Sequence, residues 1–289
     1  MRTVWLHVHV PKAGGSTIRQ LMNRNFGEGF YNSNSLLETK QYTRDDVSEI
    51  VRCHPWLRGF CDHKLSLVLP FDSEHANVHA LCFVRDPVER FVSRFFFHRN
   101  FEEVNCVAQK MSFREFASAE LVDHYAHPQT NSQINFLNGG TGNQDLQPIQ
   151  SAIKTGKTIL APIEKFDETC VCLEKLYPDD FQDLSYVRVN TSNRNDAIAD
   201  EDREFVAEHL ADDQPLIELA SAELEKLIDR AFETREQFSS TLNKFKERCG
   251  HRFHNFRSPL QPGERLSEKH EVSNDKSTNK PDHVNDAKA

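Results

Sequence analysis

Two stretches of the chain each show an apolar segment followed by residues at helical spacing. Residues 3–10 (TVWLHVHV) are apolar and β-branched, which predicts a strand, and residues 18–22 (IRQLM) after a short loop are typical of a helix. Residues 78–84 (VHALCFV) predict a second, buried strand. Asp86 can cap a helix that begins at Pro87, where proline loses no hydrogen bond. The pattern therefore predicts two strand-to-helix corners.

The C-terminal part of the chain changes from a helical to a polar pattern. Residues 202–248 carry apolar residues at helical spacing, interrupted near residues 212–215 (DDQP), which predicts two or more helices covering a sheet. From about residue 251 onward polar residues dominate, and such a composition cannot offset the entropy of ordering. We therefore expect an α/β domain over residues 1–250, with a central parallel sheet flanked by helices, and a disordered polar tail over residues 251–289.

Composition and charge narrow the class of protein. The chain has 289 residues, 38% of them hydrophobic, and can bury one large core. Its net charge of −9 argues against general nucleic-acid binding. The seven cysteines are odd in number and several lie in apolar stretches, so we expect buried thiols rather than a disulfide framework. No apolar run is long enough to span a membrane and no signal pattern precedes the first strand, which predicts a cytoplasmic protein.

The loop between the first predicted strand and helix is suited to hold a phosphate group. Gly14 and Gly15 let the backbone approach a ligand closely. Ser16 and Thr17 add hydroxyl groups, the helix N-terminus adds partial positive charge, and Lys12 adds a full one. In the common nucleotide loop the lysine follows the glycines and a hydroxyl binds a metal, whereas here the lysine precedes them. A plain strand-to-helix turn is the alternative.

The second corner carries a further candidate anion site. Arg85 stands at the end of the second predicted strand, and ligands of parallel sheets collect at that edge. Ser93, two turns into the following helix, could face the same space. A guanidinium with a hydroxyl suits a second phosphate. A local ion pair between Arg85 and Asp86 at the helix start is the alternative.

The two corners together resemble a known family. Residues 9–17 (HVPKAGGST) are similar to its Pro/Gln-Lys-Thr-Gly/Ala-Gly/Ser-Thr loop, and residues 85–93 (RDPVERFVS) match its Arg-Asp-Pro-x-x-Arg-x-x-Ser segment. The family is that of the carbohydrate sulfotransferases, which includes the heparan sulfate 2-O- and 6-O-sulfotransferases and has a nucleotide-binding fold of the P-loop kind. Weaker similarities lie in three later segments, residues 131–139, 158–176 and 187–192.

The resemblance implies a donor, 3′-phosphoadenosine 5′-phosphosulfate, which leaves adenosine 3′,5′-bisphosphate as the product. Its 3′-phosphate would bind Arg85 and Ser93. Lys12 would lie near the bridging oxygen that becomes the leaving group, and no metal is expected. The residues that would hold the 5′-phosphosulfate are Lys12, Ala13, Gly14, Gly15, Ser16 and Thr17.

The resemblance also implies a histidine general base, because the family places one after its second strand in a Gly-His segment. The best match among the fourteen histidines is His63, in residues 58–63 (RGFCDH). Asp62 replaces the family's glycine and would offer a carboxylate that orients the ring or raises its basicity. A glutamate or aspartate base is the fallback. Asn131 and Gln133 are candidate contacts to the acceptor substrate.

The function predicted from the sequence is transfer of a sulfuryl group in line to a hydroxyl of an acceptor, most plausibly a glycan or a glycosylated small molecule. A kinase-like phosphotransferase and a nucleotide-binding regulator without catalysis are the alternatives. Relatives that act on animal glycosaminoglycans work in the Golgi lumen behind a membrane anchor. That location would apply here only if the sequence were trimmed.

Other groups of residues favour packing over chemistry. His124 and His127 have a spacing that could bind a metal on a helix, but no third ligand is evident. His7 and His9 share one strand face, which is more often a packing feature, and His9 would support the loop. The four phenylalanines within residues 91–97 are most simply the core face of a helix.

Overall fold

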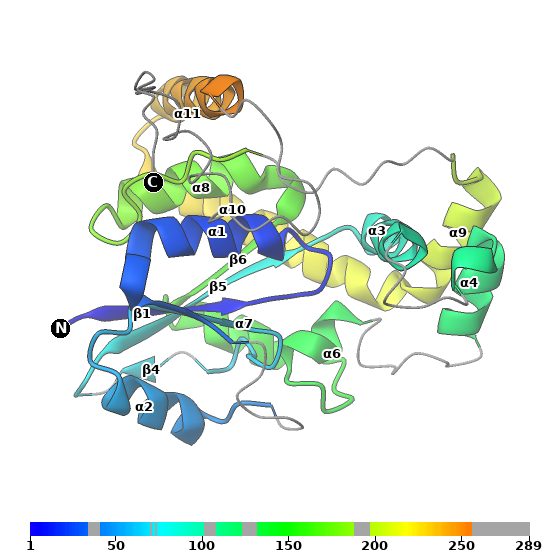
Figure 1. Ribbon diagram of the computed structural model, residues 1–289, viewed down its shortest axis with the longest axis horizontal. Coiled ribbons are helices and arrows are strands. Elements are labelled where there is room, and N and C mark those ends of the chain that lie inside the picture. Colours follow the sequence, from blue (N-terminus) through cyan, green and yellow to red (C-terminus); the bar gives the residue numbers. More distant parts are fainter. Residues whose placement is uncertain are drawn as a thin grey trace, which may run out of the picture.

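The protein is described by a computed structural model that covers residues 1–33, 41–69, 71–72, 74–100, 108–122, 132–187 and 197–255. Figure 1 shows a central sheet with helices on both sides, which confirms the predicted α/β class. The strands are β1 (Thr3–Val8), β2 (Phe30–Asn32), β3 (Gly59–Asp62), β4 (Phe71–Asp72), β5 (Asn77–Val84) and β6 (Thr158–Pro162). The α-helices are α1 (Gly15–Phe26), α2 (Arg44–Cys53), α3 (Pro87–Asn100), α4 (Phe113–Leu121), α6 (Gln133–Leu137), α7 (Gln147–Lys154), α8 (Phe166–Leu176), α9 (Asp200–His209), α10 (Gln214–Ala231) and α11 (Arg235–Asn255).

The sheet has five parallel strands in the order β2-β3-β1-β5-β6, and β4 pairs antiparallel with the start of β5. In the middle of the sheet, Val8 at the end of β1 pairs with Asp62 of β3 on one side and with Cys82 of β5 on the other. The loops that follow these three strands therefore leave the sheet at one edge. Ligands of open parallel sheets bind at the carboxyl ends of the strands, at the point where the connections from β1 lead to strands on opposite sides of it.

The strand β2 is a short addition that the apolar pattern did not indicate. It has three residues, of which Tyr31 and Asn32 are exposed, so it shows no buried run. Because β2 precedes β3, the strand that ends at Asp62 is the third of the chain rather than the second. β2 forms the outer edge of the sheet beside β3.

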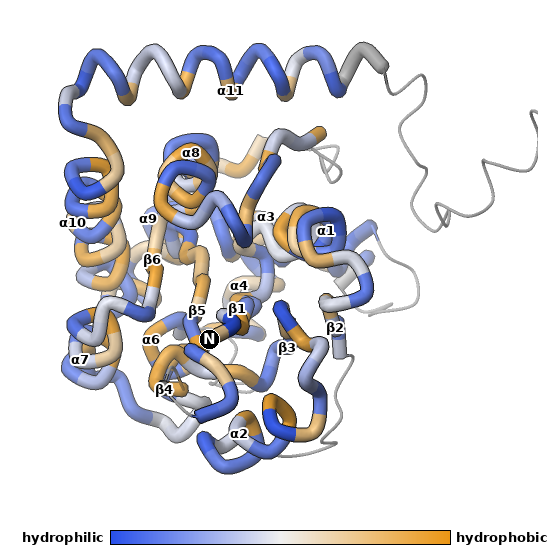
Figure 2. The backbone as a smooth tube through the Cα atoms, turned by 90° about the vertical axis from the view of Figure 1, so that its left-hand side faces the viewer, coloured by the Kyte–Doolittle hydropathy of each residue, from blue (hydrophilic) through white to orange (hydrophobic). Residues whose placement is uncertain are grey.

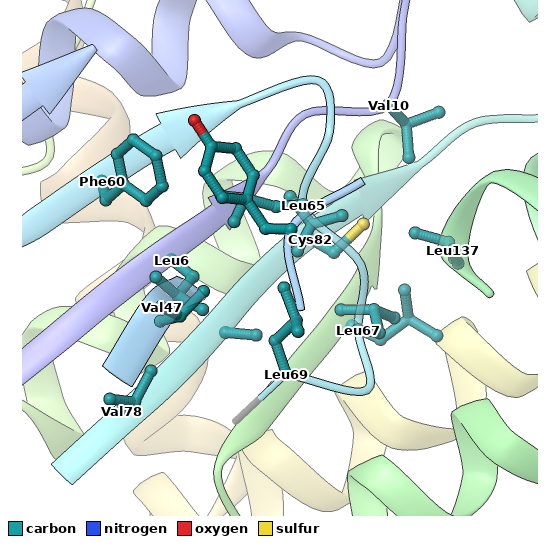
Figure 3. Close-up of a cluster of buried hydrophobic side chains, with 14 of the residues drawn as sticks. Leu6, Val10, Val47, Phe60, Leu65, Leu67, Leu69, Val78, Cys82 and Leu137 are labelled. Carbon is teal, nitrogen blue, oxygen red and sulfur yellow. The ribbon is translucent and has the colours of Figure 1, made fainter. Parts of the chain in front are cut away.

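Two apolar layers enclose the sheet. On one face, Trp5 of β1 packs with α1, α8 and α11, and in Figure 2 these helices lie above the strands. On the other face, Leu6 of β1 lies beside Val47 of α2, as Figure 3 shows, and both belong to a cluster that also includes Leu67. The long helix α10 runs beside β6 at the edge of the sheet and contributes to both layers. The alternating side chains of β1 thus supply both cores.

A third apolar cluster joins α3, α4 and α9 at the carboxyl end of the sheet. It buries Phe91, Phe95 and Phe96, as the helical spacing predicted, whereas Phe97 is half-buried and turns toward the first loop. The start of α3 also follows the prediction, because an Asp86 carboxylate oxygen accepts a hydrogen bond from the Glu89 amide at 2.9 Å.

The C-terminal helices agree with the predicted pattern. A 3₁₀ turn (η4, Ala211–Asp213) separates α9 from α10, where the sequence predicted an interruption, and α11 continues past residue 251 to Asn255. The remainder of the predicted tail lies outside the described residues, so its disorder stays a prediction.

The structure also bears on the cysteines and on membrane association. The six described cysteines are free thiols, four of them buried, and Cys106 lies outside the described residues. No described helix combines the length and the apolar character that crossing a membrane requires. The cytoplasmic location expected from the sequence stays a prediction.

Candidate active site

The loop between β1 and α1 has the backbone shape of an anion cradle. Lys12 and Gly14 both adopt left-handed conformations, with φ of 67° and 80°, and Lys12 is the one described non-glycine residue with positive φ. Helix α1 then begins at Gly15 with no side-chain cap and no acidic residue in its first turn. The Thr17 amide donates to the Gly14 carbonyl oxygen at 3.1 Å, so the amides of Gly15 and Ser16 and the positive dipole end are left for an external anion.

The two glycines of the loop are required by protein neighbours as well as by the predicted ligand. A Cβ atom on Gly14 would lie 2.4 Å from the Cδ1 atom of Ile163, which follows β6. A Cβ atom on Gly15 would lie 1.7 Å from the Nε2 atom of His9. Both distances are far below van der Waals contact, so larger residues would displace the loop.

The ammonium group of Lys12 is held by the helix of the second corner. Its Nζ atom lies 4.0 Å from the centre of the Phe97 ring on α3, a cation–π contact. Burial lowers the pKa of Lys12 to about 8, and the nearby positive charge of Arg85 acts in the same direction. A bound anion would reverse that destabilisation of the charged form.

Arg85 brings the two corners together. Its Nη1 atom donates a hydrogen bond to the Lys12 carbonyl oxygen at 3.2 Å, so the side chain at the end of β5 reaches the loop after β1. The Nη2 atom lies 3.8 Å from a carboxylate oxygen of Glu89 in the first turn of α3, and this contact replaces the Asp86 ion pair considered from the sequence. Ser93 lies on α3 and is partly buried, and its contact with a phosphate stays a prediction.

The backbone of Arg85 is fixed by Gln133. The Gln133 carboxamide accepts a hydrogen bond from the Arg85 amide at 3.0 Å and donates one to the Arg85 carbonyl oxygen at 2.8 Å. Gln133 is 0% exposed. The acceptor contact predicted for Gln133 would require this side chain to leave the Arg85 peptide, and Asn131 lies outside the described residues.

A buried carboxylate supports Gln133 in turn. Asp213, at the junction of η4 and α10, accepts hydrogen bonds from the amides of Gln133 at 2.7 Å and Ile134 at 3.2 Å. These amides form the N-terminus of α6, where a carboxylate is favourable. The sequence indicated only a break between helices at this aspartate, because the burial that gives it a partner depends on the tertiary fold.

His63 lies at the loop after β3 with its protonation pattern determined by a backbone contact. Its Nδ1 atom is 2.8 Å from the His9 carbonyl oxygen. Since a carbonyl can only accept, Nδ1 carries the proton, and the neutral ring has its lone pair on Nε2. Burial is the main cause of a lowered pKa at His63, and the positive charge of Arg19 contributes. The ring is therefore neutral near pH 7, as a general base requires.

Of the two roles considered for Asp62, orienting the His63 ring is not what the structure shows, whereas raising the basicity of the ring agrees with the charge of Asp62. Its buried carboxylate accepts hydrogen bonds from the Lys64 amide at 2.8 Å and the Tyr42 hydroxyl at 3.2 Å, on the face opposite the histidines. Successive residues of a strand point to opposite faces, so Asp62 does not share the partner that orients His63. It acts on the ring by charge, which raises the pKa of His63 against the larger effect of burial.

A shallow groove of about 390 Å³ begins at the cradle and runs between α1 and β2. Arg19 on α1 is close enough to His63 for its charge to lower the pKa of that ring. Within the described residues no carboxylate lies at ion-pair distance from Arg19. Sequence reasoning missed this arginine, because a basic residue on a helix is usually solvent-exposed. The lining residues are Ser16, Arg19, Gln20, Asn23, Phe30 and Asn32.

The other histidines pack as expected. His7 is buried, with its Nδ1 atom 3.0 Å from the Cys61 sulfur, and it stacks on His9 with ring centres 5.2 Å apart. Over the described ranges no three His, Cys, Asp or Glu side chains gather as metal ligands would. His124 and His127 lie outside those ranges.

Known proteins share similarity with this chain in sequence and in structure. The sequence model of a family described as "Sulfotransferase family" matches residues 2–207. Among solved structures, a sulfotransferase from Alicyclobacillus acidocaldarius is similar, with 14% sequence identity and a TM-score of 0.40 over 75% of this chain and 96% of that one. No match was found among curated proteins.

Proposed function

The chain belongs to the sulfotransferase family, and we propose that it transfers a sulfuryl group from 3′-phosphoadenosine 5′-phosphosulfate to a hydroxyl of a carbohydrate acceptor. The observation that carries this proposal is the hydrogen bond between the Arg85 guanidinium and the Lys12 carbonyl oxygen. It makes two cationic corners into one site, and the donor has two separate phosphate groups to occupy them. A donor with a single phosphate end would occupy only one of the two corners.

The donor would bind through backbone amides, hydroxyls and two cations. The amides of Gly14, Gly15 and Ser16, with the hydroxyls of Ser16 and Thr17, would hold the 5′-phosphosulfate. The Ala13 amide already donates to the Val10 carbonyl oxygen at 3.2 Å, so Ala13 would line the loop without donating. The uncapped N-terminus of α1 supports this assignment, as does the absence of acidic residues from its first turn. Arg85 and Ser93 would take the 3′-phosphate, to which a guanidinium can donate two hydrogen bonds.

In the proposed reaction His63 is the general base. Its Nε2 atom takes the proton of the acceptor hydroxyl while the oxygen forms a bond to sulfur. The bond between sulfur and the bridging oxygen breaks, and its electron pair stays on the 5′-phosphate of the product. Lys12 neutralises that charge, and the scheme contains no metal. The neutral Nε2 lone pair implied by the His9 carbonyl contact supports this role.

The groove between α1 and β2 is the proposed acceptor site. It begins at Ser16 of the cradle and includes the carboxamides of Gln20, Asn23 and Asn32. Carboxamides can donate to and accept from hydroxyl groups, which suits a sugar. Its opening beside the cradle supports an acceptor whose hydroxyl reaches the donor sulfur.

Calorimetric titration with adenosine 3′,5′-bisphosphate tests the donor assignment. Wild type should bind, and Arg85→Ala should weaken binding at least about tenfold, since a charge-assisted contact is lost. Arg52→Ala is the matched control, because Arg52 is an exposed residue of α2 paired with Glu49. Equal affinities for wild type and Arg85→Ala, or no binding by wild type, would refute the assignment.

A screen with labelled donor then identifies the acceptor. Transfer of label to a sugar hydroxyl is the expected result. Magnesium-dependent transfer from ATP would instead support a phosphotransferase, and tight bisphosphate binding without transfer to any acceptor would support a regulator.

A further inference from the structure

We propose that His9 is a positioning residue. Its side chain lies between the His63 ring and the backbone at Gly15, and so it sets the distance between the general base and the donor loop. The inference rests on the roles proposed above for His63 and for the loop. In this proposal the His9 side chain determines the distance between His63, which takes the proton, and the loop that holds the donor.

The first half of the argument is the contact with His63. The two rings stack with centres 3.9 Å apart and planes 25° from parallel, while the His63 Nδ1 atom donates to the His9 carbonyl oxygen at 2.8 Å. The backbone of His9 therefore determines the His63 tautomer, and its ring covers one face of the base. Together these contacts restrict both the rotation and the tilt of the His63 ring.

The second half is the contact with the loop. The His9 Nε2 atom lies where a Cβ atom on Gly15 would be, at 1.7 Å from that position. The ring cannot withdraw freely, since His7 stacks against it with ring centres 5.2 Å apart and the residue is only 8% exposed. A shift of the loop at Gly15 must therefore move the His9 ring, and through it the base.

His9 is unsuited to be the base itself. Its ring is enclosed by the loop and by its two stacked neighbours. Burial lowers the pKa of His9 far below the usual range, and the positive charges of Arg19 and Lys12 act in the same direction. A permanently neutral ring can separate two groups without adding charge to the site.

A double-mutant cycle tests the loop half of the proposal. Gly15→Ala should weaken bisphosphate binding about tenfold or more, because the new methyl group collides with the His9 ring. The double variant Gly15→Ala with His9→Ala should recover the affinity of His9→Ala alone. Gly14→Ala is the matched control, since its methyl group meets Ile163, and His9→Ala should not rescue it.

Nitrogen-15 NMR of labelled histidines tests the base half in protein without ligand. His63 of wild type should show a single neutral tautomer with the proton on Nδ1. In His9→Ala the backbone carbonyl remains but the stacked ring that holds the His63 ring against it is lost. The His63 ring can then tilt away from the carbonyl, so we expect the Nδ1-protonated tautomer to lose population to the other one. His9→Asn keeps a flat polar group and should give a tautomer population of His63 between those of wild type and His9→Ala. If the alanine variant is unstable, a melting curve of His9→Asn shows that this variant is folded.

The outcomes separate this inference from the proposed function. Wild type that fails to bind bisphosphate contradicts the donor assignment, and the NMR experiment then decides on His9 alone: Gly15→Ala should shift the His63 signals, and Arg52→Ala on the exposed side of α2 should not. Unchanged His63 tautomers in His9→Ala, or loss of binding in Gly15→Ala that His9→Ala does not relieve, would overturn the inference.

Discussion

The affinity for adenosine 3′,5′-bisphosphate should fall as the pH rises from neutral to alkaline, because Lys12 loses its proton in that range. Burial and the charge of Arg85 lower the pKa of Lys12 to about 8 in the free protein. The phosphate groups of the ligand favour the ammonium form, so the complex keeps its proton to higher pH. Binding above this pKa therefore takes up a proton, and it weakens as protons become scarce.

The magnitude follows from the fraction of protein that carries the charged lysine. With a pKa of about 8, the protonated fraction is about nine tenths at pH 7 and about one tenth at pH 9. The apparent dissociation constant is the intrinsic constant divided by that fraction, so the affinity should drop about tenfold. This corresponds to ~1.4 kcal/mol.

Isothermal titration calorimetry over this pH range measures the effect directly. The phosphate groups have their second pKa near 6 and contribute little to the slope above pH 7. Lys12→Arg is the control, since a guanidinium keeps its charge throughout and should give a nearly flat profile. A flat profile in wild type would refute the reasoning, and so would a slope of equal size in Lys12→Arg.

Three further changes have defined outcomes. His63→Ala should leave bisphosphate affinity nearly unchanged and lower kcat about a hundredfold in steady-state assays. In wild type, kcat/KM should fall on the acid side only below pH 6.5, the ordinary pKa of histidine, because the pKa of His63 is lowered. Gln133→Leu removes the two hydrogen bonds to the amide and carbonyl of Arg85, which should cost about 1–3 kcal/mol for each in urea unfolding and weaken bisphosphate binding. Arg19→Gln should raise the KM of the acceptor and the pKa of the acid limb, with bisphosphate affinity unchanged by calorimetry.

The donor side of the site was the part most accessible to sequence reasoning. Apolar runs revealed β1 and β5, and the glycines and Asp86 marked the helix starts that follow them. In a parallel sheet such corners meet at one edge, so the proximity of Lys12 and Arg85 followed from the order of the elements. Local sequence patterns therefore sufficed to predict this contact, because the parallel-sheet fold itself brings the ends of β1 and β5 together.

The supporting contacts could not be predicted in this way. The carboxylate of Asp213 and the carboxamide of Gln133 come from distant segments, and no local pattern relates either of them to Arg85. The partner of His63 is a carbonyl oxygen, which every residue has, so side-chain chemistry pointed instead to neighbouring Asp62. These contacts depend on which side chains become buried together, and burial is a property of the whole fold.

The hydrogen bonds that the first amides of α6 donate to Asp213 show how much of the chain the site depends on. The segment that matches the family ends at residue 207, and the aspartate that holds Gln133 beneath Arg85 comes after it. A protein shortened to residues 2–207 would keep Lys12, His63 and Arg85 but would lose Asp213, which caps α6. The segment that the family model matches is thus shorter than the part of this chain that holds the site in shape. A fragment meant to keep the site should extend through α10 and not stop at residue 207.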